Sequence, residues 1–270
     1  MMSGGGGRVG GRVFGAVERF LRFEPGIPQA AHVVGRLPGG TAPVIYAARH
    51  DTHAALVDAV AHGRETQWLT RRALTEVGPE GSRALQILDR YRPEIRYTHG
   101  TGSLYEPSAN TVTIDLDNGH PGVGLVHELT HVEWTHQGRA ADIMTMARHD
   151  YVGRKLGEET DASVRQIYAH AHLQTSQPHL NLPDTTLQPE FTQGYGSAVH
   201  EAETAAQAQG RVLTPEERAL AGDTGGRQAV YGAFQNGQVR TSGPGSPPYP
   251  QFVGETWDAY RQSLREYGLL

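Results

Sequence analysis

The chain has 270 residues, a net charge of −5 and no cysteine. Its hydrophobic content of 37 % and mean hydropathy of −0.49 are ordinary for a globular protein with a buried core. The acidic balance provides no basic field for a nucleic-acid backbone, so we expect no nucleic-acid partner. Without cysteine, disulfide scaffolds, thiolate nucleophiles and iron–sulfur ligation are excluded, and any metal site depends on histidine and carboxylate ligands.

The first residues predict a flexible leader. Residues 1–13 are rich in glycine and arginine and lack the apolar segment of a signal peptide. No apolar run in the sequence is long enough to span a membrane. We therefore expect the protein either to be secreted or injected into another cell by a route that does not use a signal peptide, or to stay in the cytoplasm.

Hydrophobic periodicity predicts helices first and then strands. Helical spacing indicates helices over residues 14–23, 53–77 and 82–91. Apolar and polar residues then alternate over residues 93–97 and 110–116, which predicts two strands joined as a hairpin by the turn between them.

Helical spacing resumes after the glycine and proline residues at 119–122. It predicts further helices over residues 123–136, 140–156, 158–173, 198–210, 215–221 and 254–267. Residues 183–189 and 242–250 read as a loop and a turn-rich linker. The expected fold class is therefore α+β, mostly helical with a small sheet.

The helix expected over residues 123–136 carries an HExxH motif. His127 and His131 lie one helical turn apart, so both imidazoles share a face and can bind one Zn²⁺. Glu128 is too close in sequence to bind the same ion but can reach a water beside it, the position of a general base. Apolar neighbours indicate that this helix is buried, which argues against two unrelated surface histidines.

A catalytic zinc site needs a third protein ligand. The metzincin pattern requires a histidine at position 137, where this chain has Gln137, so that class is excluded. Helical phase over residues 158–173 places Glu159 on the flank of the apolar stripe and Glu158 towards solvent. Glu159 is therefore the expected third ligand, and Glu158 is the alternative.

Two aspartates are further candidates near this site. Asp161 is either an acceptor for the N–H of a ligand histidine or an acid at the surface of the first helical turn. Asp150 is a rival third ligand. We interpret His136 and His149 as surface histidines.

The predicted strand, the glycine–proline turn, the HExxH helix and the later glutamate pair resemble gluzincin-type zinc metallopeptidases. Among these, the closest resemblance is to bacterial secreted effector and toxin peptidases, and it covers residues 95–168. It implies a zincin-like catalytic domain over residues 14–180, whose sheet has an edge strand bordering the active-site cleft. Residues 181–270 are then expected to form a helical part packed on that domain.

The resemblance also implies roles for individual residues. The strand before the motif binds substrate by strand addition in this family, which assigns substrate contacts to Thr111, Thr113 and Asp115. The second glutamate of the pair is the third ligand in the neurotoxin pattern. The family's oxyanion-stabilising tyrosine is assigned to Tyr231, four residues after an arginine on the expected helix face. Tyr195 and His200 are the alternatives for this role.

These features predict a monomeric zinc endopeptidase that hydrolyses a peptide bond in a protein substrate, as a secreted bacterial effector or toxin. One alternative is a cytoplasmic housekeeping or anti-restriction peptidase. Another is an inactive binding module stabilised by zinc, which a fourth ligand such as His136 or His149 would favour. The single lysine, Lys155, suits either a toxin that avoids ubiquitin conjugation or GC-rich codon usage.

Overall fold

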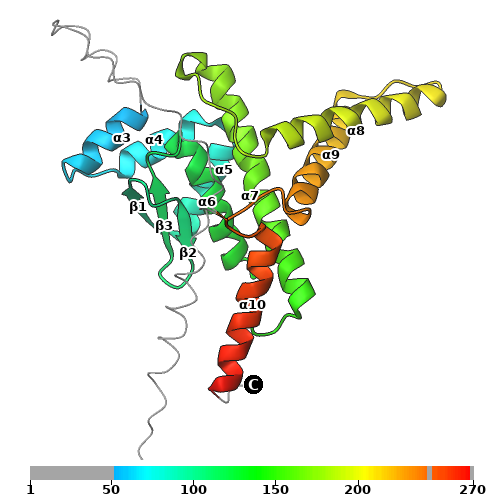
Figure 1. The fold of residues 1–270 in the computed structure, drawn as a ribbon. Coiled ribbons are helices and arrows are strands. Elements are labelled where there is room, and N and C mark those ends of the chain that lie inside the picture. The colour runs from blue at the N-terminus through cyan, green and yellow to red at the C-terminus, as the bar shows by residue number, and fades with distance from the viewer. Residues whose placement is uncertain (1–51, 242–244, 268–270) are drawn as a thin grey trace, which may run out of the picture.

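The computed structural model describes residues 52–241 and 245–267. These residues form helices around one three-stranded sheet, so the α+β class expected from the sequence is confirmed (Figure 1). The leader over residues 1–13 and the helix expected over residues 14–23 lie outside the described residues.

Within the part of the chain that the structure describes, three helices precede the sheet: α3 (Thr52–Ala61), α4 (Gln67–Glu76) and α5 (Gly78–Tyr91). The sequence predicted one helix over residues 53–77, and the structure divides it into α3 and α4. Gly63 lies at the division with a φ of +62°, a left-handed conformation that glycine adopts without steric strain. The apolar faces of all three helices pack against the sheet and α6.

The sheet has the order β1–β3–β2, with β1 (Glu94–Thr98), β2 (Leu104–Glu106) and β3 (Thr111–Asp115). The predicted hairpin between the first and last of these is wrong, because β1 and β3 pair in parallel. The segment interpreted as their turn contains β2, which forms the antiparallel hairpin with β3. A strand of three residues is too short to show the alternation by which strands are recognised.

Two helices follow the sheet and hold the candidate site. Helix α6 (Pro121–His136) begins with proline at its first position, and the His120 side chain accepts a hydrogen bond from the backbone N–H of Gly122. Helix α7 (Arg148–Ser176) is a single helix where the sequence predicted two. The ion pair between Lys155 and Glu158 spans the expected break at residue 157.

The C-terminal part consists of the short 3₁₀ helix η1 (Pro178–Leu180) and the helices α8 (Gln188–Ala208), α9 (Pro215–Gln235) and α10 (Tyr249–Glu266). Helices α8 and α9 lie side by side and project away from the sheet (Figure 1). Helix α8 begins ten residues before the predicted start, and α9 ends fourteen residues after the predicted end. Glycines in these added parts allow close packing of the two helices. A Cβ on Gly225 would lie only 2.6 Å from the backbone oxygen of Gly194.

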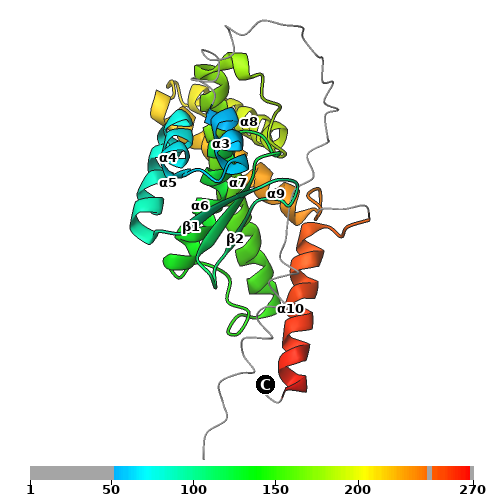
Figure 2. The ribbon, with the colours of Figure 1, turned by 90° about the vertical axis from the view of Figure 1, so that its left-hand side faces the viewer.

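Helix α7 lies between two groups of buried apolar side chains. One group joins its C-terminal half to the sheet and helices α3 to α6, and the other joins its N-terminal half to α8, α9 and α10. Helix α10 runs beside the first turns of α7 in both views (Figures 1 and 2). None of the described helices combines the length and apolar character needed to cross a membrane.

Candidate metal centre

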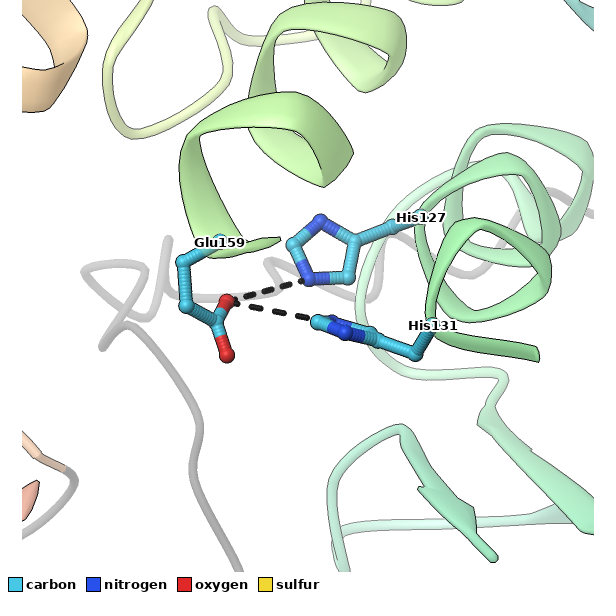
Figure 3. A group of neighbouring side chains, drawn as sticks. All are labelled: His127, His131 and Glu159. Carbon is cyan, nitrogen blue, oxygen red and sulfur yellow. Dashed lines mark ion pairs between the residues drawn. The ribbon is translucent and has the colours of Figure 1, made fainter. Parts of the chain in front are cut away.

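Helices α6 and α7 bring three potential metal ligands together (Figure 3). The Oε2 atom of Glu159 lies 3.6 Å from Nε2 of His127 and 3.8 Å from Nε2 of His131. Two ligand atoms bound to one tetrahedral zinc ion at about 2.0 Å lie about 3.3 Å apart, so small side-chain movements suffice for binding. The three residues form the only such group found within the part of the chain that the structure describes, and they could hold a metal ion.

The two neighbouring glutamates of α7 both face α6. Glu159 lies beside the histidines, as helical phase predicted. Glu158 was expected to face solvent, and this prediction is wrong: the residue is 3 % exposed, and its Oε1 lies 2.8 Å from Nδ1 of His131. Helical phase identified the apolar stripe of α7 but not the neighbouring helix that covers its flank.

Both histidines have a partner for Nδ1. Nδ1 of His131 contacts Glu158, and Nδ1 of His127 lies 3.2 Å from Oε1 of Gln166. A neutral imidazole with its proton on Nδ1 donates that proton to its partner. Its Nε2 lone pair is then free to bind a metal ion beside Glu159. The sequence did not indicate Gln166. This residue lies about two helical turns beyond Glu159 and belongs to no motif.

The only lysine of the chain supports this arrangement. Nζ of Lys155 lies 2.9 Å from Oε2 of Glu158, so the Glu158 carboxylate bridges an ammonium group and a candidate ligand histidine. Burial alone would raise the pKa of Glu158, but Lys155 and His131 outweigh it and lower the pKa to about 2. The carboxylate is therefore ionised at neutral pH and can accept the Nδ1 proton of His131.

Glu159, the third potential ligand, has a partner from a distant part of the chain. The hydroxyl of Tyr249, the first residue of α10, donates a hydrogen bond of 2.8 Å to Oε1 of Glu159. Burial and the nearby Glu159 carboxylate raise the pKa of Tyr249 well above its usual value, so the phenol keeps its proton. The sequence predicted a turn-rich linker over residues 242–250, so this contact was missed, and the two prolines before Tyr249 were the only available signal.

The pKa values of Glu159 and His131 are shifted in opposite directions. Burial alone would raise the pKa of Glu159, but His131 and His127 lower it to about 2. Burial alone would lower the pKa of His131, but Glu159 and Glu158 raise it to about 9. Before a metal binds, the site therefore holds ionised carboxylates and a protonated His131 at neutral pH.

Glu128 lies in the same cleft as the three potential ligands and is 6 % exposed. Burial raises its pKa, against the opposing effect of His127 and His131. The backbone of Tyr105, on β2, also opposes this rise in the pKa of Glu128. Tyr105 and Glu128 line the same cleft, so the edge of the sheet borders the residue expected to act as the general base.

The cleft has a volume of about 530 Å³. Residues 103–105 form its wall on the side of the sheet, helices α6 and α7 contribute the ionisable groups, and α10 forms the opposite wall. A cleft of this size is large enough for several atoms of a bound peptide or small molecule.

The strand assigned to substrate binding does not have a free edge. Strand β3 lies between β1 and β2, so the expectation that it accepts an added strand is corrected: β2 is the strand that borders the cleft. Thr111 and Asp115 are buried, and none of the three residues assigned to substrate lines the cleft. The Asp115 carboxylate instead accepts hydrogen bonds from the backbone of Gly100 and Gly102, which fixes the loop before β2.

The two aspartates lie away from the ligand histidines. Asp161 accepts hydrogen bonds of 2.9 Å from the indole of Trp134 and from Arg227, so it joins α6, α7 and α9 rather than orienting His127 or His131. The side chain of Asp150 is 71 % exposed. The structure thus brings neither aspartate into the site.

The residue assigned to the oxyanion and its two alternatives also lie elsewhere. Tyr231, on α9, is half-buried against the apolar cluster that α7 shares with α8, α9 and α10, and it does not line the cleft. Tyr195 packs against Phe191, and His200 is exposed on α8. His136 stacks on Tyr91 with ring centres 4.4 Å apart, and the His149 side chain is fully exposed, so neither supplies a fourth ligand.

Comparisons with known proteins give no relative. No protein-family model matches the chain, and no curated protein or solved structure matches it. Any statement about its chemistry therefore depends on the residues and geometry of the site.

Proposed function

We propose that the protein is a zinc-dependent endopeptidase. The observation that carries this proposal is the convergence of His127, His131 and Glu159 in a cleft that also contains the buried carboxyl of Glu128. Two imidazoles and one carboxylate form a donor set typical of catalytic zinc sites. Zn²⁺ would supply the Lewis acid that polarises a carbonyl group and makes water more acidic.

The residues of the chain account for the proton transfers of hydrolysis. Glu128 takes a proton from the attacking water and passes it to the leaving amine. Burial favours these steps, because a carboxyl with a raised pKa returns the proton less readily to solvent and holds it until the amine leaves. Glu158 and Gln166 orient the two histidines, and Tyr249 orients Glu159.

The number of ligands favours catalysis over a binding module. Structural zinc sites are closed by a fourth protein ligand, whereas catalytic sites keep one position open. Among the described residues, only three potential metal ligands converge at the site, and they line a cleft. The zincin-like fold and the secreted-effector setting form part of this proposal through the sequence resemblance.

The proposal is tested with purified protein loaded with one equivalent of zinc. Wild type, Glu128→Gln and Glu201→Gln are incubated with host-cell lysate and with bacterial lysate, and new protein N-termini are labelled and sequenced. We expect wild type and the exposed control Glu201→Gln to produce the same new termini, and Glu128→Gln to bind zinc but produce none. The lysate that is cleaved distinguishes a secreted effector from a housekeeping peptidase.

Zinc content is measured in parallel by elemental analysis. His127→Ala should lose the metal, because two ligands hold zinc much more weakly than three. Undiminished cleavage by Glu128→Gln would contradict the role of the base, and one zinc per chain in His127→Ala would contradict the ligand set.

A further inference from the structure

The charged groups of the cleft are paired with one another. Lys155 pairs with Glu158, which contacts His131, while Glu159 lies between the histidines and Tyr249. Apart from these residues and Glu128, every residue lining the cleft is uncharged. A charged side chain of a ligand would therefore lose its hydration without gaining an opposite charge.

Part of the wall opposite the sheet is apolar, while Tyr249, Thr256 and Tyr260 line the rest of α10's side. Phe252 and Val253 of α10 line the apolar part together with Ala141 and Ile143 from the segment between α6 and α7. All four belong to the same hydrophobic cluster, and Ala141, Ile143 and Phe252 are half-buried, so part of their surface faces the cleft. A ligand side chain that covered this surface would be stabilised by burial of apolar area.

This wall is held in place by contacts of α10 with the first residue of α7 and with the segment just before it. The indole of Trp257 donates to the backbone oxygen of Met146 at 3.2 Å, and Arg148 pairs with Asp258 at 3.0 Å. Because these contacts lie outside the cleft, the apolar surface is positioned before any ligand binds.

The opposite wall offers a backbone edge. No strand of the described chain pairs with the outer edge of β2, and Leu104 and Tyr105 on that strand line the cleft. A peptide lying along β2 would be extended, and alternate side chains of an extended chain point to opposite sides. One of them would point across the cleft towards the wall that α10 forms.

We infer that the cleft selects an extended peptide by a large uncharged apolar side chain, such as leucine or phenylalanine, that packs on Ala141, Ile143 and Phe252. This inference rests on the proposed peptidase function, because it places the peptide beside the metal centre. Discrimination in apolar pockets suggests a preference of about tenfold or more over glycine.

Binding of hydroxamates to the zinc-loaded wild type tests the inference without requiring cleavage. The probes are hydroxamates of N-acetylated glycine, leucine, phenylalanine, aspartate and lysine, and affinities are measured by calorimetry. We expect the leucine and phenylalanine compounds to bind at least about tenfold more tightly than the glycine compound. The aspartate and lysine compounds should bind no more tightly than glycine.

Substitutions at Ile143 distinguish a change in ligand preference from a loss of folding. Ile143→Asp should abolish the preference for leucine and favour the lysine compound, whereas Ile143→Lys should favour the aspartate compound. A reversal of this kind cannot result from an unfolded variant. Ala259→Asp, on the exposed side of α10, is the matched control and should bind all five probes as the wild type does.

The outcomes separate the inference from the function on which it rests. Zinc-dependent binding of all five hydroxamates with equal affinity would overturn the inference and leave the zinc site intact. Tighter binding of either charged compound to the wild type would overturn it as well. A wild type that binds no zinc would overturn the proposed function itself.

Discussion

The hydroxyl of Tyr249 donates a hydrogen bond to Oε1 of Glu159, across 90 positions of sequence. The other oxygen of this carboxylate faces His127 and His131. The C-terminal helix therefore contributes directly to the orientation of a candidate ligand, and the metal centre is complete only when α10 has packed against α7.

Tyr249→Phe should weaken zinc binding about tenfold while the fold is retained, because it removes only the hydrogen bond that orients Glu159. The measurement is competition for zinc with a chelator of known affinity, together with circular dichroism. Tyr231→Phe is the control, since this residue does not line the cleft and should leave the affinity unchanged. The opposite pattern, with an effect only at Tyr231, would contradict the geometry.

Lys155→Gln should weaken zinc binding by about tenfold to a hundredfold, because it removes the ammonium group that stabilises the buried Glu158 carboxylate beside His131. Lys155→Arg keeps the positive charge and should retain most of the affinity. Both variants are compared with wild type in the same chelator assay. Equal affinities for wild type and Lys155→Gln would show that Glu158 orients His131 without the lysine.

Zinc binding should release a proton at neutral pH. The pKa of His131 is raised to about 9, so this residue is protonated in the metal-free site at pH 7 and must lose its proton to bind a metal. Affinity should therefore rise by about tenfold per pH unit up to that pKa and level off above it.

Calorimetry in two buffers of different ionisation enthalpy counts the released protons. His131→Asn should remove this proton release along with most of the affinity. Zinc binding whose enthalpy does not depend on the buffer would contradict the raised pKa.

Asp161→Asn should lower the free energy of unfolding by roughly 1–3 kcal/mol, because Asp161 is a half-buried acceptor for Trp134 and Arg227. Burial alone would raise the pKa of Asp161, but its partners outweigh burial and lower this pKa. The contribution of Asp161 to stability is therefore present above about pH 4 and is lost as the pH falls further. Denaturant unfolding measures the change. Asp150→Asn, at an exposed position, should unfold like the wild type.

The number of zinc ions bound per chain is measured for the same two variants, Asp161→Asn and Asp150→Asn. Asp161→Asn should still bind one zinc, because Asp161 contacts none of the potential ligands. Loss of the metal with an unchanged free energy of unfolding would instead support a role in orienting a ligand histidine.

Features that depend on neighbours along the chain were predictable. The spacing of His127 and His131 is set by the helical repeat, and the same repeat placed Glu159 at the edge of the next helix's apolar face. The general-base position of Glu128 follows from the same helix. These predictions need only the geometry of single helices, which the residue pattern contains.

Features that depend on packing between distant segments were not predictable. The sequence alone determined an α+β chain with a His–Glu–His helix and a glutamate placed to complete a metal site. Only the tertiary structure decided that β3 is central, that Glu158 is buried against His131, and that Tyr249 reaches Glu159. Periodicity shows which face of an element is buried, but the identity of the element that covers it depends on contacts that leave no local pattern.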